Sequence, residues 1–232
     1  MLNLWAMKTI ADEIIFSKRK TISIEVKPDG RVILRVPNRT SRKRIEEVLE
    51  SKEDWIYRTR EKIWERQAKQ AAIRFDEGAL IPLFGRAYSL KLQEQVRGGM
   101  KFEAATGFSL QRDRLEDAST LLAGVYREQT RTMVTRMARD VSKGWGLAFT
   151  GIRITSAQSR WGSCSANNKL NFSYRLALLP LELVEYVVVH ELAHTRHHNH
   201  GSGFWKVVGE IMPDHALRRK RLKELASGLP DI

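Results

Sequence analysis

Hydrophobic and polar residues alternate along the first part of the chain in the manner of short β-strands. Ile22, Ile24 and Val26 fall on one side of a strand predicted over 21–26, and a second β-rich run covers 32–36. The Lys-Pro-Asp-Gly stretch between these runs has the residues of a tight turn, so we expect a hairpin. A further strand is expected around 14–16.

Helical spacing replaces this alternation after Pro37. Ser41 can cap a helix whose apolar positions continue at helical spacing as far as Ile63, with a break near Ser51. Short strands are then predicted between glycine-containing turns, at 80–84, 88–92, 101–104 and 108–110. Together with the first hairpin, these strands would form a small β-rich subdomain that includes a basic helix.

The pattern changes again at Glu116. A long helix is predicted from there to Gly144 and Gly146. Pro180 suits the first turn of a later helix. Strands are predicted between the two helices, at 152–155, 160–163 and 171–178. These elements predict an α+β protein with two domains, an N-terminal β-rich subdomain with a basic helix over 1–115 and a second domain over 116–232.

Candidate chemistry is concentrated near the end of the chain, because all six histidines lie between positions 190 and 215. His190 and His194 are four residues apart, so on a helix both imidazoles lie on one face, close enough to hold one metal ion. Glu191 completes a His-Glu-x-x-His arrangement. Its carboxylate can take a proton from a water molecule that the metal activates, which makes Glu191 the candidate general base.

A third protein ligand is expected, because catalytic zinc sites usually have three. The candidates are His197, His198, His200 and His215. His197 shares the helical face, but a rise of about 1.5 Å per residue places it about 10 Å from His190 along the axis. The chain can turn back at 199–201, since Asn and Gly tolerate the left-handed conformation that ends helices. His200 is therefore the predicted third ligand, and His197 and His198 are expected to support the site or lie on the surface.

The same string also occurs by chance in solvated helices, where histidines cap carbonyl groups. Here the residues just before it, at 183–189, are strongly apolar apart from Glu185, which predicts a buried helix. A buried helix would not carry His190, Glu191 and His194 without a partner for these ionisable groups. The combination favours a bound divalent metal ion, with zinc as the first candidate.

Several stretches outside the histidine cluster complete a family pattern. They are Arg-Trp-Gly-Ser-Cys-Ser at 160–165, Leu-Asn at 170–171, Tyr186 to His194, Asn199-His200 and Phe204-Trp205, with 17–20, 26–30 and 54–56 in the N-terminal part. On these residues the chain resembles the YgjP-like family of zinc metallopeptidases, related to the SprT-like and zincin groups. The resemblance implies a zincin-like catalytic domain, with a metal-binding helix beside a small β-sheet. It also implies His190, His194 and His200 as zinc ligands and Glu191 as the catalytic base.

Charge adds a question about partners. The chain has 232 residues, with 40 Lys and Arg against 27 Asp and Glu, which gives a formal net charge of +13. Such an excess favours polyanionic partners such as nucleic acid, nucleotides or acidic membrane surfaces, while a merely solvated basic surface is an equal alternative. The basic runs at 42–69 and 218–223 contain few interleaved aromatic residues, and these fit core packing as well. We therefore expect weak, sequence-independent nucleic-acid binding at most.

Cys164 is the only cysteine, so no internal disulfide can form and a reducing cytoplasm is the expected compartment. No signal peptide is predicted in the first twenty residues. The most apolar segment, 176–189, is interrupted by Pro180 and two glutamates, so it is too short and too polar to span a bilayer. A nucleophilic role for Cys164 is disfavoured because nothing marks its thiolate as activated, and we expect a small buried side chain.

Arg160 lies in a predicted strand close to the metal helix. Its guanidinium can bind substrate by polarising a carbonyl or holding a phosphate, or it can pair with a local carboxylate. The edge of such a strand can also hold an extended peptide. The next residue, Trp161, is expected to anchor the core.

Three functions fit these residues. The first is a zinc metallopeptidase acting on a peptide or protein. The second is a nucleoside triphosphate pyrophosphatase that uses the same metal site, although no Gly-rich phosphate loop is visible. The third is a nucleic-acid-associated protein with a structural metal, which is disfavoured because structural zinc sites are usually closed and rich in thiolates.

Overall fold

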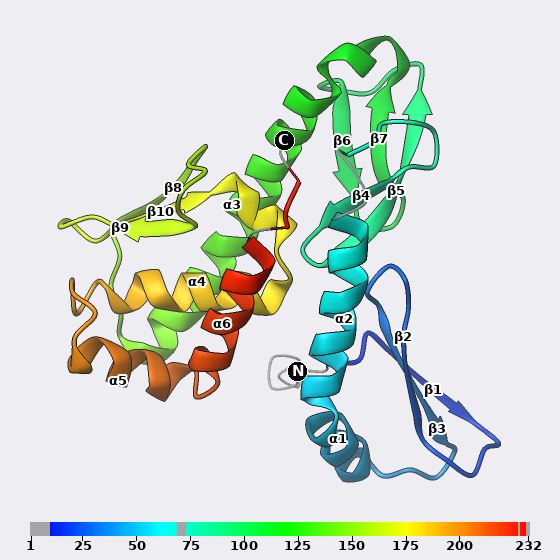
Figure 1. Ribbon diagram of the computed structural model, residues 1–232, viewed down its shortest axis with the longest axis horizontal. Coiled ribbons are helices and arrows are strands. Elements are labelled where there is room, and N and C mark those ends of the chain that lie inside the picture. The colour runs from blue at the N-terminus through cyan, green and yellow to red at the C-terminus, as the bar shows by residue number, and fades with distance from the viewer. Residues whose placement is uncertain (1–9, 69–72, 227, 231–232) are drawn as a thin grey trace. The chain divides into compact units, whose positions relative to one another are not determined.

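The computed structural model describes residues 10–68, 73–226 and 228–230 (Figure 1). The chain divides into two compact units, residues 1–70 and 71–232. Six α-helices and three small sheets in the described residues make it an α+β protein, as predicted. Within the described ranges, no helix is both long enough and apolar enough to cross a membrane.

The first unit combines a three-stranded sheet with two helices. Its elements are β1 (Glu13–Ser17), β2 (Ser23–Val26), β3 (Val32–Pro37), α1 (Arg42–Ser51) and α2 (Glu53–Ala68). β3 is the central strand, with β1 parallel and β2 antiparallel to it. The predicted hairpin is therefore confirmed, and the strand expected around 14–16 lies on the other side of β3.

The core of this unit joins the apolar faces of the sheet and the helices. Val32, Leu34 and Val36 alternate along β3 and pack with Ile45 and Leu49 of α1. All five side chains are buried. The side chains that alternate along the strand and those spaced four apart on the helix therefore pack together in one apolar cluster.

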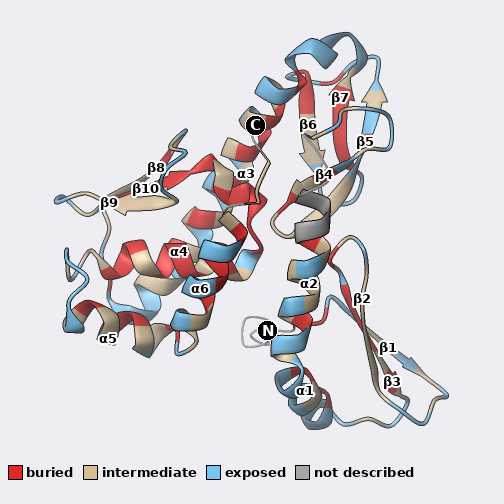
Figure 2. Ribbon diagram, in the orientation of Figure 1, coloured by how far each residue is buried: buried red, intermediate tan, exposed pale blue. Residues whose placement is uncertain are grey.

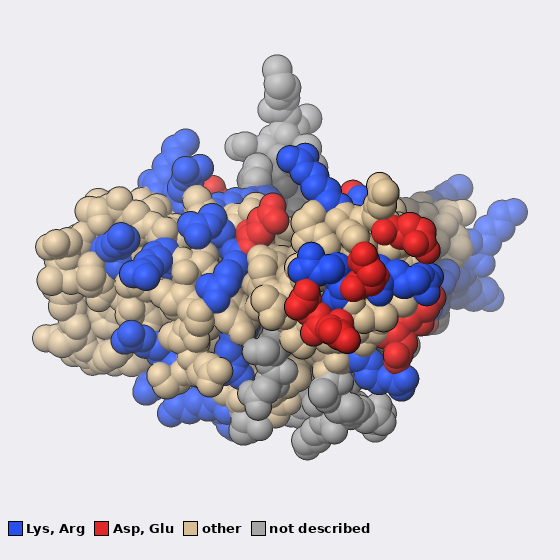
Figure 3. Space-filling model, turned by 90° about the horizontal axis from the view of Figure 1, so that it is seen from above, with Lys and Arg blue, Asp and Glu red and all other residues tan. Residues whose placement is uncertain are grey.

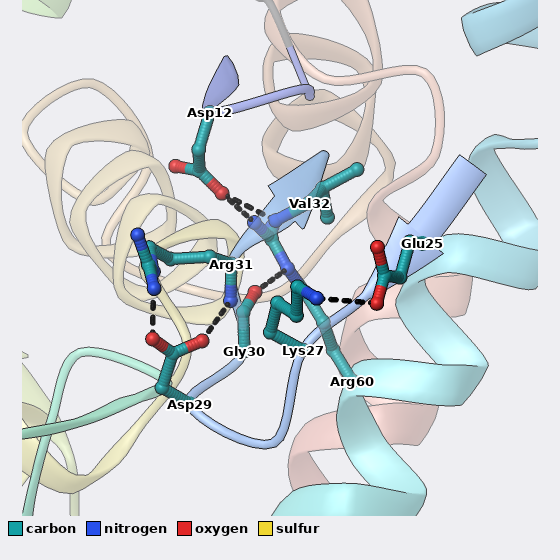
Figure 4. A network of polar contacts seen from close by, with 8 residues as sticks. All are labelled: Asp12, Glu25, Lys27, Asp29, Gly30, Arg31, Val32 and Arg60. Atoms are coloured by element: carbon teal, nitrogen blue, oxygen red, sulfur yellow. Dashed lines mark hydrogen bonds and ion pairs between the residues drawn. The ribbon is translucent and has the colours of Figure 1, made fainter. Parts of the chain in front are cut away.

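Local polar contacts fix the ends of these elements. The Ser41 hydroxyl accepts a hydrogen bond from the backbone N–H of Arg44 at 3.3 Å, which is the predicted cap of α1. The predicted break near Ser51 falls between α1 and α2. Arg60 of α2 donates to the Gly30 carbonyl at 2.7 Å and to the Asp12 carboxylate at 2.8 Å (Figure 4). The Arg60 guanidinium therefore links α2 to the turn before β3 and to Asp12, just before β1.

The second unit begins with a four-stranded sheet followed by a long helix. The elements are β4 (Leu80–Leu83), β5 (Arg86–Gln93), β6 (Met100–Glu103), β7 (Gly107–Gln111), the 3-10 helix η1 (Arg112–Asp117) and α3 (Ala118–Trp145). The strand order is β4-β5-β7-β6. α3 ends at Gly146, whose left-handed φ of 63° closes the helix, whereas Gly144 lies within it.

This division differs from the predicted boundary at residues 115 and 116. The four-stranded sheet, expected beside the first hairpin, belongs to the second unit. Tyr126 of α3 explains why, because its hydroxyl donates to the Pro82 carbonyl and its ring contacts Phe108. The backbone N–H of Phe84 also donates to the Ala177 carbonyl at 2.7 Å. These links bind the sheet to segments that follow it by tens of residues in the sequence.

The remaining elements build the half of this unit that carries the histidines. They are β8 (Gly151–Thr155), β9 (Gly162–Cys164), β10 (Lys169–Ser173), the 3-10 helix η2 (Tyr174–Leu178), α4 (Leu181–Ala193), α5 (Ser202–Ile211) and α6 (His215–Ala226). β10 is central, with β8 parallel and β9 antiparallel to it. The strand predicted over 171–178 therefore ends at Ser173. Pro180 precedes α4 as its N-cap instead of forming its first turn.

Candidate metal centre

α4 is a mostly buried helix whose last turn and C-cap carry the two histidines. Figure 2 shows most of the helix as buried, and Val187, Val188 and Val189 are each at most 3% exposed. His190 lies in the last turn and His194 caps the helix, with their ring centroids 5.1 Å apart. The apolar residues therefore hold α4 in the core and leave the two imidazoles at the edge of the unit.

His200 joins these two imidazoles from the loop between α4 and α5. Its Nε2 lies 3.0 Å from the Nε2 of His190. One ring nitrogen from each of His190, His194 and His200 lies within 4.8 Å of the others. Among the described residues this is the only group of three or more His, Cys, Asp or Glu side chains with such spacing, and neither His197, His198 nor His215 belongs to it.

The loop that brings His200 back is held by its own polar contacts. The Nδ1 of His194 lies 3.0 Å from the His197 carbonyl, so Nδ1 donates there and Nε2 stays available as a ligand. The Asn199 side-chain oxygen accepts from the Gly201 N–H at 3.2 Å. The predicted left-handed turn is wrong, because Gly201 has a φ of −71° and Asn199 has no positive φ. An Asn side-chain turn reverses the chain instead.

Two aromatic residues of α5 support the histidines. The ring of Phe204, which is fully buried, has its centroid 4.5 Å from that of His194 and 4.7 Å from that of His200. The Trp205 ring stacks on His200 with centroids 5.8 Å apart and on His215 with centroids 5.5 Å apart. Phe204 and Trp205 therefore pack directly against the imidazoles, and His215 contributes to this stack instead of to the nitrogen cluster.

The three nitrogens have the chemistry and the spacing that a zinc ion requires. Two nitrogens bound tetrahedrally at about 2.0–2.1 Å would lie about 3.3 Å apart, close to the separation of the His190 and His200 nitrogens. Burial, aided by the two neighbouring histidines and Arg219, lowers the pKa of His190 to about 3. Burial also lowers the pKa of His194. Both imidazoles are therefore neutral at physiological pH, which is the form that binds metal.

Glu191 lies on α4 beside this cluster and is only 6% exposed. Burial raises its pKa to about 8, and the Arg160 guanidinium opposes that shift. β9 passes so close that a Cβ at Gly162 would lie 2.6 Å from the Glu191 Cγ and 2.7 Å from its Oε1. A larger residue at 162 would therefore force the Glu191 side chain to move, a contact that only the fold reveals.

The structure also places the other candidate residues, Arg160, Trp161 and Cys164, and two of them are less buried than expected. Arg160 is exposed, and no carboxylate of the described residues lies within ion-pairing distance of it. Trp161, expected in the core, is only half-buried and stacks under Arg175 at 5.7 Å. Cys164 is also half-buried instead of buried, and burial together with Glu191 raises the pKa of its thiol. This shift opposes thiolate formation, in line with the expectation that Cys164 is not a nucleophile.

Three residues near the site had no site role in the sequence analysis. Tyr186 lies one helical turn before His190, and the two ring centroids are 5.8 Å apart. Arg219 and Lys223, counted there as part of a basic surface helix, lie on α6 and line a pocket next to His190. The spacing of four between Tyr186 and His190 was a usable signal, whereas the approach of α6 to α4 is visible only in the fold.

A buried helix that carries two converging imidazoles and a carboxylate, closed by a third imidazole after a turn, is the framework of a metal-dependent hydrolase. The chain belongs to the YgjP-like family, since the model of the YgjP-like metallopeptidase domain matches residues 20–225. No match was found among curated proteins.

Two solved structures show a more distant likeness. The metallopeptidase zymogen abylysin of Pyrococcus abyssi is 19% identical, with a TM-score of 0.38 over 42% of this chain and 99% of that one. The zymogen jannalysin of Methanocaldococcus jannaschii is 18% identical, with a TM-score of 0.36 over 40% of this chain and 95% of that one. The family membership rests on the match over residues 20–225.

Proposed function

We propose that the chain is a zinc peptidase in which His190, His194 and His200 hold the ion and Glu191 acts as the general base. The observation that carries this proposal is the convergence of three imidazole nitrogens beside one buried carboxylate. An exposed ligand, His200, leaves the centre open on one side, as a catalytic site requires and a structural zinc site does not.

When bound, the ion supplies Lewis acidity, which activates water and polarises a carbonyl. Glu191 accepts the proton of the attacking water. A carboxyl group with a pKa of about 8 is a stronger base than an ordinary glutamate once it is ionised. The Arg160 guanidinium favours that ionised form. Gly162 and the rest of β9 keep bulk water away from the carboxylate, so the proton remains at the site.

β9 supplies a place for an extended peptide. It is an edge strand of its sheet, and its outer side pairs with no other described strand. A substrate strand added there would run past Glu191, because Gly162 already contacts that side chain. Arg160, two residues before the start of β9, could hold a carbonyl of the same peptide.

A nucleoside triphosphate pyrophosphatase is the second candidate function. It is favoured by the three cationic side chains beside the centre, Arg160, Arg219 and Lys223, which would also attract phosphate. The peptidase is preferred because the family is a metallopeptidase family and because β9 has an outer edge that pairs with no other described strand.

A panel of peptides and nucleoside triphosphates, offered to zinc-loaded and chelator-treated protein, tests the proposal. We expect zinc-dependent cleavage of peptides and no turnover of triphosphates. Zinc-dependent hydrolysis of triphosphates without cleavage of any peptide would replace the first function by the second.

Nucleic acid enters this proposal only as a weak partner. On the face shown in Figure 3, Lys and Arg side chains are spread among other residues and partly alternate with Asp and Glu. Arg218 and Arg221, half of the basic run at 218–221, are buried. Arg218 is used inside the unit, where it pairs with Glu185 at 2.7 Å and with Asp214 at 2.8 Å. These features favour binding that is weak and independent of sequence.

A further inference from the structure

A pocket of about 340 Å³ lies directly beside the metal centre. His190 and Glu191 line one side of it. Its apolar wall includes Val187 of α4 with Leu222 and Ala226 of α6. A group held in this pocket would therefore lie next to both the metal-binding imidazole and the general base.

The pocket has a strong excess of positive charge. Arg160, Arg219 and Lys223 line it, and among the described residues that line it Glu191 is the one acidic side chain. In the part of the chain that the structure describes, none of these three cations has a carboxylate within ion-pairing distance. Arg219 instead lies over the Trp205 ring at 5.0 Å. The pocket thus offers cationic groups that form no ion pair with a described carboxylate, although Arg160 acts electrostatically on Glu191.

α6 separates two kinds of basic residue. Arg218 is 3% exposed and is held by Glu185 and Asp214, so it stabilises the unit itself. The neighbouring Arg219 and the later Lys223 are one helical turn apart on the side that faces the pocket. Buried ion pairs account for Arg218, whereas Arg219 packs only on the Trp205 ring and Lys223 forms no ion pair with a described carboxylate. The charges of Arg219 and Lys223 at the pocket therefore point to a ligand.

We propose that this pocket binds a carboxylate of the peptide substrate, carried by an acidic side chain or by the free C-terminus, next to the bond that is cleaved. The proposal rests on the proposed peptidase function and names its substrate class. Arginine and lysine would bind the carboxylate, while the methylene groups that carry it would lie against the apolar wall. A glutamate side chain fits this division better than an aspartate, because it has the longer apolar stem.

Matched peptides test the preference and separate the two sources of the carboxylate. One sequence is prepared with Glu, Gln or Lys at each position around the cleavage site, and with a free or an amidated C-terminus. We expect kcat/KM for the best Glu peptide to exceed that of its Gln counterpart by roughly five- to tenfold, and the advantage to shrink at high salt. If the free acid alone is favoured over the amide, the terminal carboxylate is the ligand.

Charge variants on α6 connect the preference to the pocket. Lys223→Gln should remove most of the advantage of the acidic peptide, and Lys223→Glu should shift the preference toward the Lys peptide. Lys220→Gln is the matched control, because Lys220 lies on the same helix, is exposed and does not line the pocket. An acidic preference that is equal in wild type, Lys223→Gln and Lys220→Gln would overturn the proposal.

A binding measurement separates failure of this proposal from failure of the peptidase function. Zinc-loaded Glu191→Gln is titrated calorimetrically with the Glu and Gln peptides. Tighter binding of the Glu peptide that is lost in a Lys223→Gln background supports the pocket even if no peptide is cleaved. Cleavage of peptides without any acidic preference overturns the proposal that the pocket binds a carboxylate, and it leaves the proposed peptidase function intact. Preferential binding of a nucleoside triphosphate over every acidic peptide also overturns it.

Discussion

Replacing Glu191 by glutamine should make the metal-free protein more stable. The same change should remove most of the hydrolytic activity of the zinc-loaded protein. The change keeps the shape of the side chain and removes its ability to ionise. In the folded protein, burial raises the pKa of Glu191 from 4.5 to about 8. Ionising this carboxyl group therefore costs more in the folded than in the unfolded chain, and glutamine avoids that cost.

The size of the effect follows from the pKa shift. A rise from 4.5 to about 8 is 3.5 units, which at about 1.4 kcal/mol per unit amounts to roughly 5 kcal/mol. Because the folded pKa is the higher one, Glu191 costs no stability below its unfolded pKa of 4.5. The loss grows as the pH rises from 4.5 and reaches its full size once the pH has passed the folded pKa of about 8. At pH 7 the loss is about 3 kcal/mol, and at pH 5 it is below about 1 kcal/mol.

Urea unfolding of chelator-treated wild type and Glu191→Gln, followed by circular dichroism, measures this difference. We expect the two proteins to be similar at pH 5 and the variant to be more stable at pH 8.5. A stability difference that stays constant between these pH values would refute the burial argument. The zinc-loaded variant should keep its metal and lose about 10²- to 10⁴-fold in hydrolysis, the usual contribution of a general base. Activity within a few-fold of wild type would exclude Glu191 from that role.

Three further predictions concern the ligands, the strand and the charge. His200→Ala should lose zinc, whereas His215→Ala should retain it, as measured by metal analysis after dialysis; the opposite pattern would show that the third ligand is misassigned. Gly162→Ala should lower the stability by about 1–3 kcal/mol and reduce activity, because the added methyl group displaces Glu191; unchanged activity would contradict the close approach of β9. DNA and RNA should bind weakly, without sequence preference and with a steep decrease as salt rises, in a fluorescence titration; tight, sequence-specific binding at physiological salt would contradict this account of the charge.

Local patterns predicted most elements and the histidine cluster. The alternation at 21–36 and the turn residues between the strands gave the first hairpin, because both signals are contained in a few neighbouring residues. The spacing of His190, His194 and His200 gave the nitrogen cluster for the same reason, since all three lie within eleven residues. When a helix is followed directly by a turn, few conformations are open to the chain, so the positions of these three side chains can be predicted from their spacing.

Contacts between distant segments could not be predicted in this way. The sheet at 80–111 was expected with the first hairpin, but its partners Tyr126 and Ala177 lie far along the chain. The basic run at 218–221 looks uniform in sequence, yet Arg218 is buried in ion pairs while Arg219 faces a pocket. Which side of α6 meets α4 decides this difference, and helical spacing alone does not fix it.

The contact between Gly162 and Glu191 gives a physical reason for the glycine in the Arg-Trp-Gly-Ser-Cys-Ser stretch. The two residues are 29 positions apart, and any side chain at 162 would occupy the space of the carboxylate. The close approach has two consequences at once. It helps to bury Glu191, which raises the pKa of this proposed base, and it brings the outer edge of β9, which pairs with no other described strand, beside the carboxyl group. A peptide paired with β9 would thus be positioned by the same strand that sets the basicity of Glu191, so a change at Gly162 should affect both the binding of a peptide and its cleavage.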